Sequence, residues 1–171
     1  KLDTCMELVH GALDGGHRIL LFSQFTGMLD IIGKRLAKED IAFLKLTGAS
    51  SKESRAKMVA QFQAGKVPIF LISLKAGGVG LNLTAADVVI HYDPWWNVAA
   101  QDQATDRAHR IGQQHTVTVY KLIAKDTIEE RIMQMQESKR DLVNSVLGGD
   151  GISSALFTRE DVLALLGGDG R

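Results

Sequence analysis

The chain has 171 residues, 45% hydrophobic and 23% charged, a composition typical of one globular domain with a sizeable core. Lysine plus arginine and aspartate plus glutamate number 20 each, so the zero net charge excludes binding of nucleic acid through overall positive charge, and any such site must be a local patch. Cys5 is the only cysteine, which excludes a disulfide framework and favours a reducing compartment.

The predicted elements alternate along the chain. A helical pattern is already present at Lys1, which indicates a piece of a longer protein. Five short apolar segments then read as strands, and three of them are almost continuously hydrophobic, as in a parallel sheet buried on both faces. These segments are residues 18–23, 42–46, 68–73, 87–93 and 117–124.

Amphipathic segments separate and follow these strands. Helical spacing of apolar residues predicts helices over 24–38, 51–64, about 97–110 and 126–147. The helix at 51–64 opens with Ser50 and Glu53 in the arrangement of a capping box, and it stops at Gly65.

The helix at 126–147 opens with a second capping pair, Asp126 and Glu129. We expect Met133 and Met135 to fill the core rather than to contact a cofactor. The apolar stripe of this helix consists of Ile128, Ile132, Met135, Leu142 and Val146.

This alternation predicts an α/β fold, a three-layer sandwich with a mostly parallel central sheet and a helical C-terminal extension. Ligands of such sheets bind beyond the carboxyl ends of the strands, so we expect the chemistry in the loops after Ser73 and Asp93. The domain should span residues 1–147. The tail at 148–171 carries GGDG at both ends and reads as a flexible joint with one short helix capped by Thr158, or as a docking helix.

The remaining titratable residues show no pattern of a metal site. We expect the histidines to have structural or surface roles and Cys5 to be a buried apolar residue. No apolar run is long enough to span a bilayer, and no secretory leader is visible. The histidines are His10, His17, His91, His109 and His115.

The loop SLKAGGVGLNLT, residues 73–84, directly follows a predicted strand. Its glycines at 77, 78 and 80 allow close backbone approach, and the amides of such a loop can bind an anion. No Gly-Lys-Ser/Thr follows, so it is not a Walker phosphate loop. A tight turn with no ligand is the alternative, although Lys75 and Asn82 favour a loop that faces phosphate.

The stretch HYDPWWNVAAQ, residues 91–101, places two tryptophans after Pro94. Neighbouring residues of a loop do not both point inward easily, so we expect one of Trp95 and Trp96 to be exposed or stacked on a partner. Aromatic side chains beside polar residues suit contacts to bases or sugars, and packing against the core is the alternative.

The stretch DQATDRAHRIGQ, residues 102–113, carries ordered positive charge. On a helix, Gln103, Arg107 and Arg110 fall within a sector of roughly 60°. The planar fork of arginine suits phosphate oxygens, whereas the alternative is a surface helix in which Asp102 and Asp106 form ion pairs with the arginines. The neighbouring sector holds small and apolar residues that let the helix lie close to the sheet: Ala100, Ala104, Ala108 and Ile111.

Together, these stretches resemble the second RecA-like lobe of the Swi/Snf family of DNA-dependent ATPases, within the superfamily-two helicases. RILLFSQFTGMLDII resembles helicase motif four, SLKAGGVGLNLTAADVVIHYDPWWN resembles motif five with its extension, and QATDRAHRIGQ resembles motif six. YKLIAKDTIEERI follows as it does in the family. The resemblance covers residues 1–147, and the final segment is similar to bacterial members.

The resemblance implies that ATP and Mg²⁺ bind between two lobes, mainly on an N-terminal lobe that is absent here and that carries the phosphate loop and an acidic pair. In this lobe Arg107 and Arg110 would be catalytic arginine fingers, and Gln103, Gly80 and Asn82 would lie near the nucleotide. An arginine finger accelerates phosphoryl transfer by about three to five orders of magnitude. The isolated lobe is therefore expected to be inactive.

The resemblance also implies a track for double-stranded DNA, contacted through phosphate and sugar without sequence preference. The chain departs from the family at Thr47-Gly48, where many members have Asp-Gly, and at Val98, where a proline is common. The expected location is intracellular: the nucleoid of a bacterium or the nucleus of a eukaryote. The residues expected to face DNA are Gln24, Ser73, Lys75, Trp95 and Asn97.

The resemblance thus favours an ATP-dependent translocase or remodeller of double-stranded DNA. Two alternatives stay open: a lobe of a helicase that separates strands of DNA or RNA, and a RecA-like module that binds nucleic acid without catalysis. A hydrolase with a cysteine or serine nucleophile has no support, because Cys5 and the serines have no base arranged beside them in the sequence.

Overall fold

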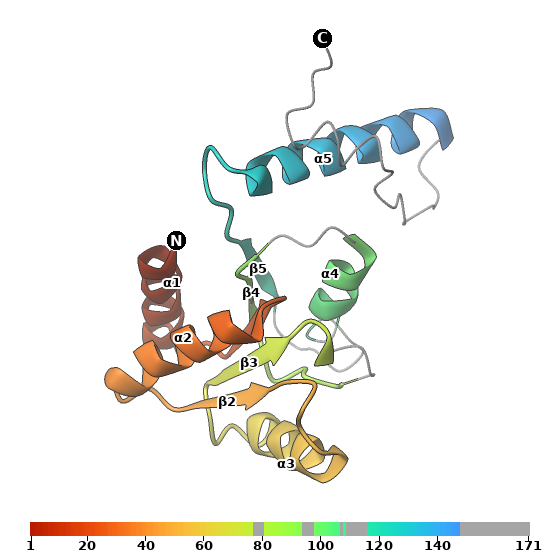
Figure 1. The fold of residues 1–171 in the computed structure, drawn as a ribbon. Coiled ribbons are helices and arrows are strands. Elements are labelled where there is room, and N and C mark those ends of the chain that lie inside the picture. The colour runs from red at the N-terminus through yellow and green to blue at the C-terminus, as the bar shows by residue number, and fades with distance from the viewer. Residues whose placement is uncertain (77–80, 94–97, 107, 109–115, 148–171) are drawn as a thin grey trace.

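The computed structural model describes residues 1–76, 81–93, 98–106, 108 and 116–147 (Figure 1). Its five strands form one parallel sheet in the order β2-β3-β1-β4-β5. Each strand lies inside one of the segments predicted from the sequence. The strands are β1 (Ile19–Ser23), β2 (Phe43–Leu46), β3 (Ile69–Ser73), β4 (Val88–His91) and β5 (Thr118–Lys121).

Helices cover both faces of the sheet, which confirms the three-layer α/β sandwich (Figure 1). On one face, α1 and α2 pack against alternate residues of the strands, such as Leu21 and Leu71. On the other face, α3 and α4 pack against the residues between them, such as Phe22 and Phe70. The helices are α1 (Leu2–Asp14), α2 (Thr26–Lys38), α3 (Lys52–Gln63), α4 (Val98–Thr105) and α5 (Ile128–Leu147).

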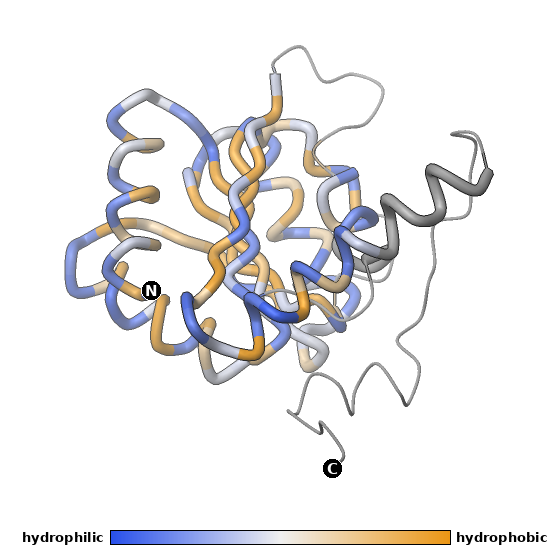
Figure 2. The backbone as a smooth tube through the Cα atoms, turned by 90° about the horizontal axis from the view of Figure 1, so that it is seen from above, coloured by the Kyte–Doolittle hydropathy of each residue, from blue (hydrophilic) through white to orange (hydrophobic). Residues whose placement is uncertain are grey.

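The central strands β1, β3 and β4 are buried along their whole length, because each is flanked by two strands and covered on both faces. This explains their nearly continuous hydrophobic sequence. In Figure 2 the hydrophobic colour runs through the middle of the molecule, whereas the helices alternate between hydrophobic and hydrophilic residues. Cys5, on the inner face of α1, is fully buried in the core, as expected.

The start of α3 differs from the prediction by one residue. The capping residue is Ser51, whose Oγ accepts a hydrogen bond from Ser54 N, and not Ser50. Ser50 Oγ instead accepts a hydrogen bond from Thr47 N at 3.2 Å in the preceding turn. The end of α3 is as predicted, since Gly65 follows it with a φ of +74° that favours glycine.

The start of α5 also differs from the prediction. Thr127, and not Asp126, accepts a hydrogen bond from a first-turn amide, that of Glu129 at 3.2 Å. Asp126 has a φ of +58°, and its amide donates to Glu130 Oε2 at 2.9 Å. Side-chain oxygens of Thr127 and Glu130 therefore accept hydrogen bonds from backbone amides in the first turn of α5 and in the turn before it.

The expected apolar stripe of α5 is only partly buried. Ile132 is buried and Met133 and Met135 are half-buried, in line with a packing role. Ile128, a member of the predicted stripe, is 40% exposed, because it lies at the first residue of α5 beside the exposed turn. The side chains of Leu142 and Val146 and the tail at 148–171, including Thr158, lie outside the described residues. Within the described part, no helix is long and apolar enough to cross a membrane.

Candidate functional site

The carboxyl ends of β1 and β3 lie next to each other. Their register pairs Ser23 with Ser73, and both serines are buried. Leu74 N continues the ladder by donating to Ser23 O at 3.0 Å. The loops that follow the two strands therefore start side by side at the edge where α/β sheets bind ligands.

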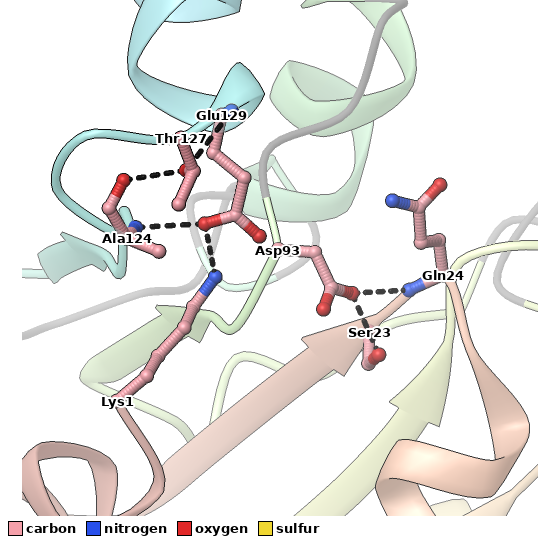
Figure 3. A network of polar contacts seen from close by, with 7 residues as sticks. All are labelled: Lys1, Ser23, Gln24, Asp93, Ala124, Thr127 and Glu129. Carbon is pink, nitrogen blue, oxygen red and sulfur yellow. Dashed lines mark hydrogen bonds and ion pairs between the residues drawn. The ribbon is translucent and has the colours of Figure 1, made fainter.

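A buried carboxylate joins the turn after β1 to the end of β4 (Figure 3). Asp93, 5% exposed, accepts hydrogen bonds from Ser23 Oγ at 2.7 Å and from Gln24 N at 2.8 Å. Phe25 N in turn donates to Ser23 Oγ at 3.1 Å. The turn is thus held at both ends. The side chain of Gln24 extends away from the Asp93 carboxylate (Figure 3), and Phe25 is 59% exposed.

The loop after β3 is held where it leaves the strand. Arg55 on α3 donates from Nη1 to the carbonyl oxygen of Ala76 at 2.9 Å, and Ala76 itself is buried. Lys75 is exposed, and so is Asn82 on the far side of the loop. Residues 77–80, including Gly80, lie outside the described residues. The described ends of the loop therefore present one cationic and one amide group to solvent.

Helix α4 carries the start of the arginine-rich segment. Ala104 and Ala108 are buried against the sheet, as the sequence predicted, and Gln103 is exposed. Ala108 N donates to Thr105 O at 3.0 Å and closes a turn at the end of the helix. Arg107 and Arg110, with Trp95, Trp96 and Asn97, lie outside the described residues, so their roles stay predictions.

A buried histidine contacts the end of α4. His91, 1% exposed, is the last residue of β4, and its Nε2 lies 3.0 Å from Thr105 Oγ1. Its ring stacks on that of Phe22 in the adjacent strand, with centroids 5.5 Å apart and 20° between the planes. Burial, aided by the positive charge of Lys121, lowers the pKa of His91 from 6.5 to about 4. The ring is therefore neutral at physiological pH, and it is buried among core residues.

The starts of α1 and α5 are joined by a second polar network (Figure 3). The Glu129 carboxylate pairs with Lys1 Nζ and accepts a hydrogen bond from Ala124 N at 2.7 Å. Thr127 Oγ1 donates to Ala124 O at 2.7 Å. Lys1 Nζ also lies 5.1 Å from the centroid of the Tyr92 ring, next to Asp93. The junction of α1, α5 and the end of β4 is therefore a single connected unit.

The other described histidines lie at the surface. His17 Nδ1 contacts Asp87 Oδ2 at 2.8 Å, and His10 is exposed on α1. Burial raises the pKa of Asp87, but hydrogen bonds from His17 and the Arg18 amide outweigh it, and the net effect is a lowered pKa. Among the described residues, no group of three or more His, Cys, Asp or Glu could hold a metal ion.

The parallel five-stranded sheet with helices on both faces defines a RecA-like lobe. It superimposes on the C-terminal part of the Fun30 ATPase domain with a TM-score of 0.75 and 41% identity, covering 78% of this chain and 43% of that one. Residues 1–112 match the helicase conserved C-terminal domain, and the chain belongs to this family, as a lobe of the Swi/Snf type.

Two relatives are similar to almost the whole chain. An uncharacterized ATP-dependent helicase of Mycoplasma pneumoniae is 45% identical over 96% of this chain. The chromatin-remodeling ATPase INO80 of Cryptococcus neoformans is 47% identical over 95% of it. The chain spans only 16% and 9% of the lengths of these two proteins, so it corresponds to one part of each.

Sequence reasoning found the loops of this site but missed the side chains that hold them together. Asp93, Arg55 and His91 were not among the predicted site residues, although Asp93 directly follows a buried strand. A polar residue within an otherwise apolar strand, as with His91, is the signal that could have found them, because a buried polar group needs a partner. Ser73 was predicted to face DNA, and its side chain is 1% exposed.

Proposed function

We propose that this chain is the C-terminal ATPase lobe of an ATP-dependent translocase that moves along double-stranded DNA and remodels what is bound there. The family and the relatives named as ATP-dependent helicase and remodeling ATPase support this. The observation that carries the proposal is the packing of α4 and of the turn after it. Ala104 and Ala108 are buried on the sheet, while Gln103, which the sequence groups with Arg107 and Arg110, is exposed.

In the proposed mechanism, ATP and Mg²⁺ are bound mainly by an N-terminal lobe. The exposed side chains of Gln103, Lys75 and Asn82 can all donate hydrogen bonds, and Lys75 adds positive charge, which fits a polyphosphate facing this edge. Closure of the lobes brings Arg107 and Arg110 to the γ-phosphate, where they stabilise the charge that develops during transfer. We assign Gly80 and Asn82, in the sequence after β3, to the nucleotide.

DNA contacts are proposed at the same edge. Gln24 and Lys75 follow β1 and β3, whose ends adjoin, so both side chains can approach one phosphate backbone. Trp95 and Asn97 extend this track in the segment after Asp93. Because Ser73 is buried, we assign it to the support of the loop through its strand and leave the direct contact to Lys75. Residues 1–147 form the lobe, and 148–171 form a separate tail.

The decisive test is Arg110→Ala in the full-length protein. We expect nucleotide affinity to change little while kcat falls by about three to five orders of magnitude, as for loss of an arginine finger. Arg35→Ala, which removes an exposed arginine on α2, is the matched control and should leave kcat unchanged. Equal loss of binding and turnover in Arg110→Ala would contradict the finger assignment.

A second test addresses the movement on DNA. A translocase displaces the third strand of a triplex without separating the duplex beneath it. We therefore expect ATP-dependent triplex displacement by the full-length protein and no strand separation of a forked duplex. Strand separation at a comparable rate would assign the lobe to an unwinding helicase instead.

A further inference from the structure

The end of α4 and the turn that follows it pack on the sheet through small side chains. Ala104 on α4 and Ala108 just after it are 2% and 0% exposed. A methyl side chain allows close approach but does not interdigitate deeply, so alanine contacts resist sliding or rotation of a helix weakly. A directional contact adds resistance to such movement.

Such a contact comes from His91. Its backbone is fixed on both sides, because Tyr92 N donates to Phe22 O at 2.9 Å and Leu122 N donates to His91 O at 2.9 Å. Its ring is held by stacking on Phe22 and by burial, and only its Nε2 reaches the helix, at Thr105 Oγ1. A hydrogen bond therefore links the sheet to the last residue of α4.

We infer that His91 is a positioning residue for catalysis, which acts by fixing Thr105 and thereby the segment that carries Arg107 and Arg110. The inference rests on the proposed arginine fingers. Thr105 is the last residue of α4, its carbonyl oxygen accepts the hydrogen bond from Ala108 N, and Arg107 lies between these two residues in the sequence. The contact with His91 therefore lies at the start of the turn that Thr105 and Ala108 close.

The surroundings of His91 argue against a role in stability alone. Its Nδ1 is buried and has no hydrogen-bond partner in the described part of the chain, which is unfavourable for a polar atom. A phenylalanine in this place would keep the stacking on Phe22 and would bury no polar nitrogen. Histidine is therefore unfavourable at position 91 if its only role is stability. It suits a role that requires a hydrogen bond to Thr105.

The test uses the full-length protein with His91→Phe and Thr105→Val. Each change removes one partner of the hydrogen bond and keeps a similar shape. We expect kcat for ATP to fall about tenfold in each variant, since a small misplacement of a catalytic group costs one to two orders of magnitude, with KM for ATP within about twofold. Thr105→Ser keeps the hydroxyl and should retain kcat.

The double variant is the specific readout. Because both single changes break the same contact, we expect His91→Phe with Thr105→Val to lower kcat no further than either change alone. Additive losses, or wild-type kcat in both single variants, would overturn the inference. If His91→Phe fails to fold, the Thr105→Val and Thr105→Ser variants decide the question, because Thr105 is only half-buried.

The arginine variants separate failure of this inference from failure of the proposed function. If Arg107→Ala and Arg110→Ala also keep full kcat, the proposed function fails. If they lose kcat while the His91 and Thr105 variants do not, only the positioning role fails.

Discussion

The carboxylate of Asp93 accepts a hydrogen bond from Ser23 Oγ at 2.7 Å, although the two residues are 70 apart in sequence. Asp93 also accepts the amide of Gln24 at 2.8 Å. The turn after β1 and the segment after β4 are therefore a single rigid unit at the start of the proposed DNA track. A change at this carboxylate should affect both segments at once.

Asp93→Ala should destabilise the chain by roughly 2 to 3 kcal/mol, because it leaves the buried Ser23 hydroxyl and the partly buried Gln24 amide without their acceptor. Urea denaturation measures this loss. Asp93→Asn keeps one acceptor oxygen and should lose less. Asp102→Ala, at an exposed position of α4, is the control and should be close to neutral. An equal effect of Asp93→Ala and Asp102→Ala would show that the buried network contributes little.

Ser51→Ala should cost about 1 kcal/mol of unfolding free energy, because Ser51 Oγ accepts the amide of Ser54 at the start of α3. Ser51→Asn supplies another capping oxygen and should be nearly neutral. Ser54→Ala is the matched control, since it keeps the amide donor and removes only an exposed hydroxyl. Denaturation midpoints that rank these variants in any other order would contradict the assignment of Ser51 as the cap.

Stability should fall as the pH falls from 6.5 to about 4, because the pKa of His91 is lowered to about 4 in the folded chain. Between these two pH values His91 binds a proton in the unfolded chain but not in the folded chain. The stability that the neutral His91 gives the folded chain above pH 6.5 is therefore lost as the pH falls through this window. The loss amounts to roughly 3 kcal/mol at the acid end. The difference in unfolding free energy between wild type and His91→Phe, measured from pH 7 to pH 4, isolates it. A difference that does not change with pH would mean that His91 titrates normally.

Gly65→Ala should cost about 1 kcal/mol, because the φ of +74° at Gly65 disfavours any side chain. A Cβ there would also lie 2.1 Å from Arg18 Nη2, so the guanidinium must move aside. Gly48→Ala is the matched control, since a Cβ at Gly48 meets nothing within 4 Å. Thermal unfolding should show a lower Tm for the first variant only.

The Cys5 thiol should resist alkylation in the folded chain. Burial raises its pKa to about 12, and the side chain is fully buried between α1 and the sheet. The thiol is therefore protonated and out of reach of the reagent. Reaction with a thiol reagent should therefore follow the opening of the core and speed up with added urea. Rapid labelling in buffer, at the rate of a free peptide thiol, would mean that α1 is detached.

The sequence predicted the strands and the two core faces because burial on both sides leaves a strong signal in β1, β3 and β4. It also predicted that Ala104 and Ala108 pack on the sheet. Exact helix starts were harder, since Ser50 and Ser51 are chemically alike and only the turn geometry decides which one caps α3. The contacts of Asp93 and His91 could not be predicted, because they join segments whose proximity depends on the strand order β3-β1-β4.

One outer strand of the sheet has a practical consequence. Among the described residues β5 hydrogen-bonds only to β4, and all four of its side chains are exposed, with Val119 and Tyr120 each at 38%. An open strand edge with exposed apolar groups is a template for pairing with another chain. Purified preparations of this lobe should therefore self-associate as the protein is concentrated. A charged substitution such as Val119→Lys is the simplest way to keep the lobe monomeric without touching the proposed ATP or DNA contacts.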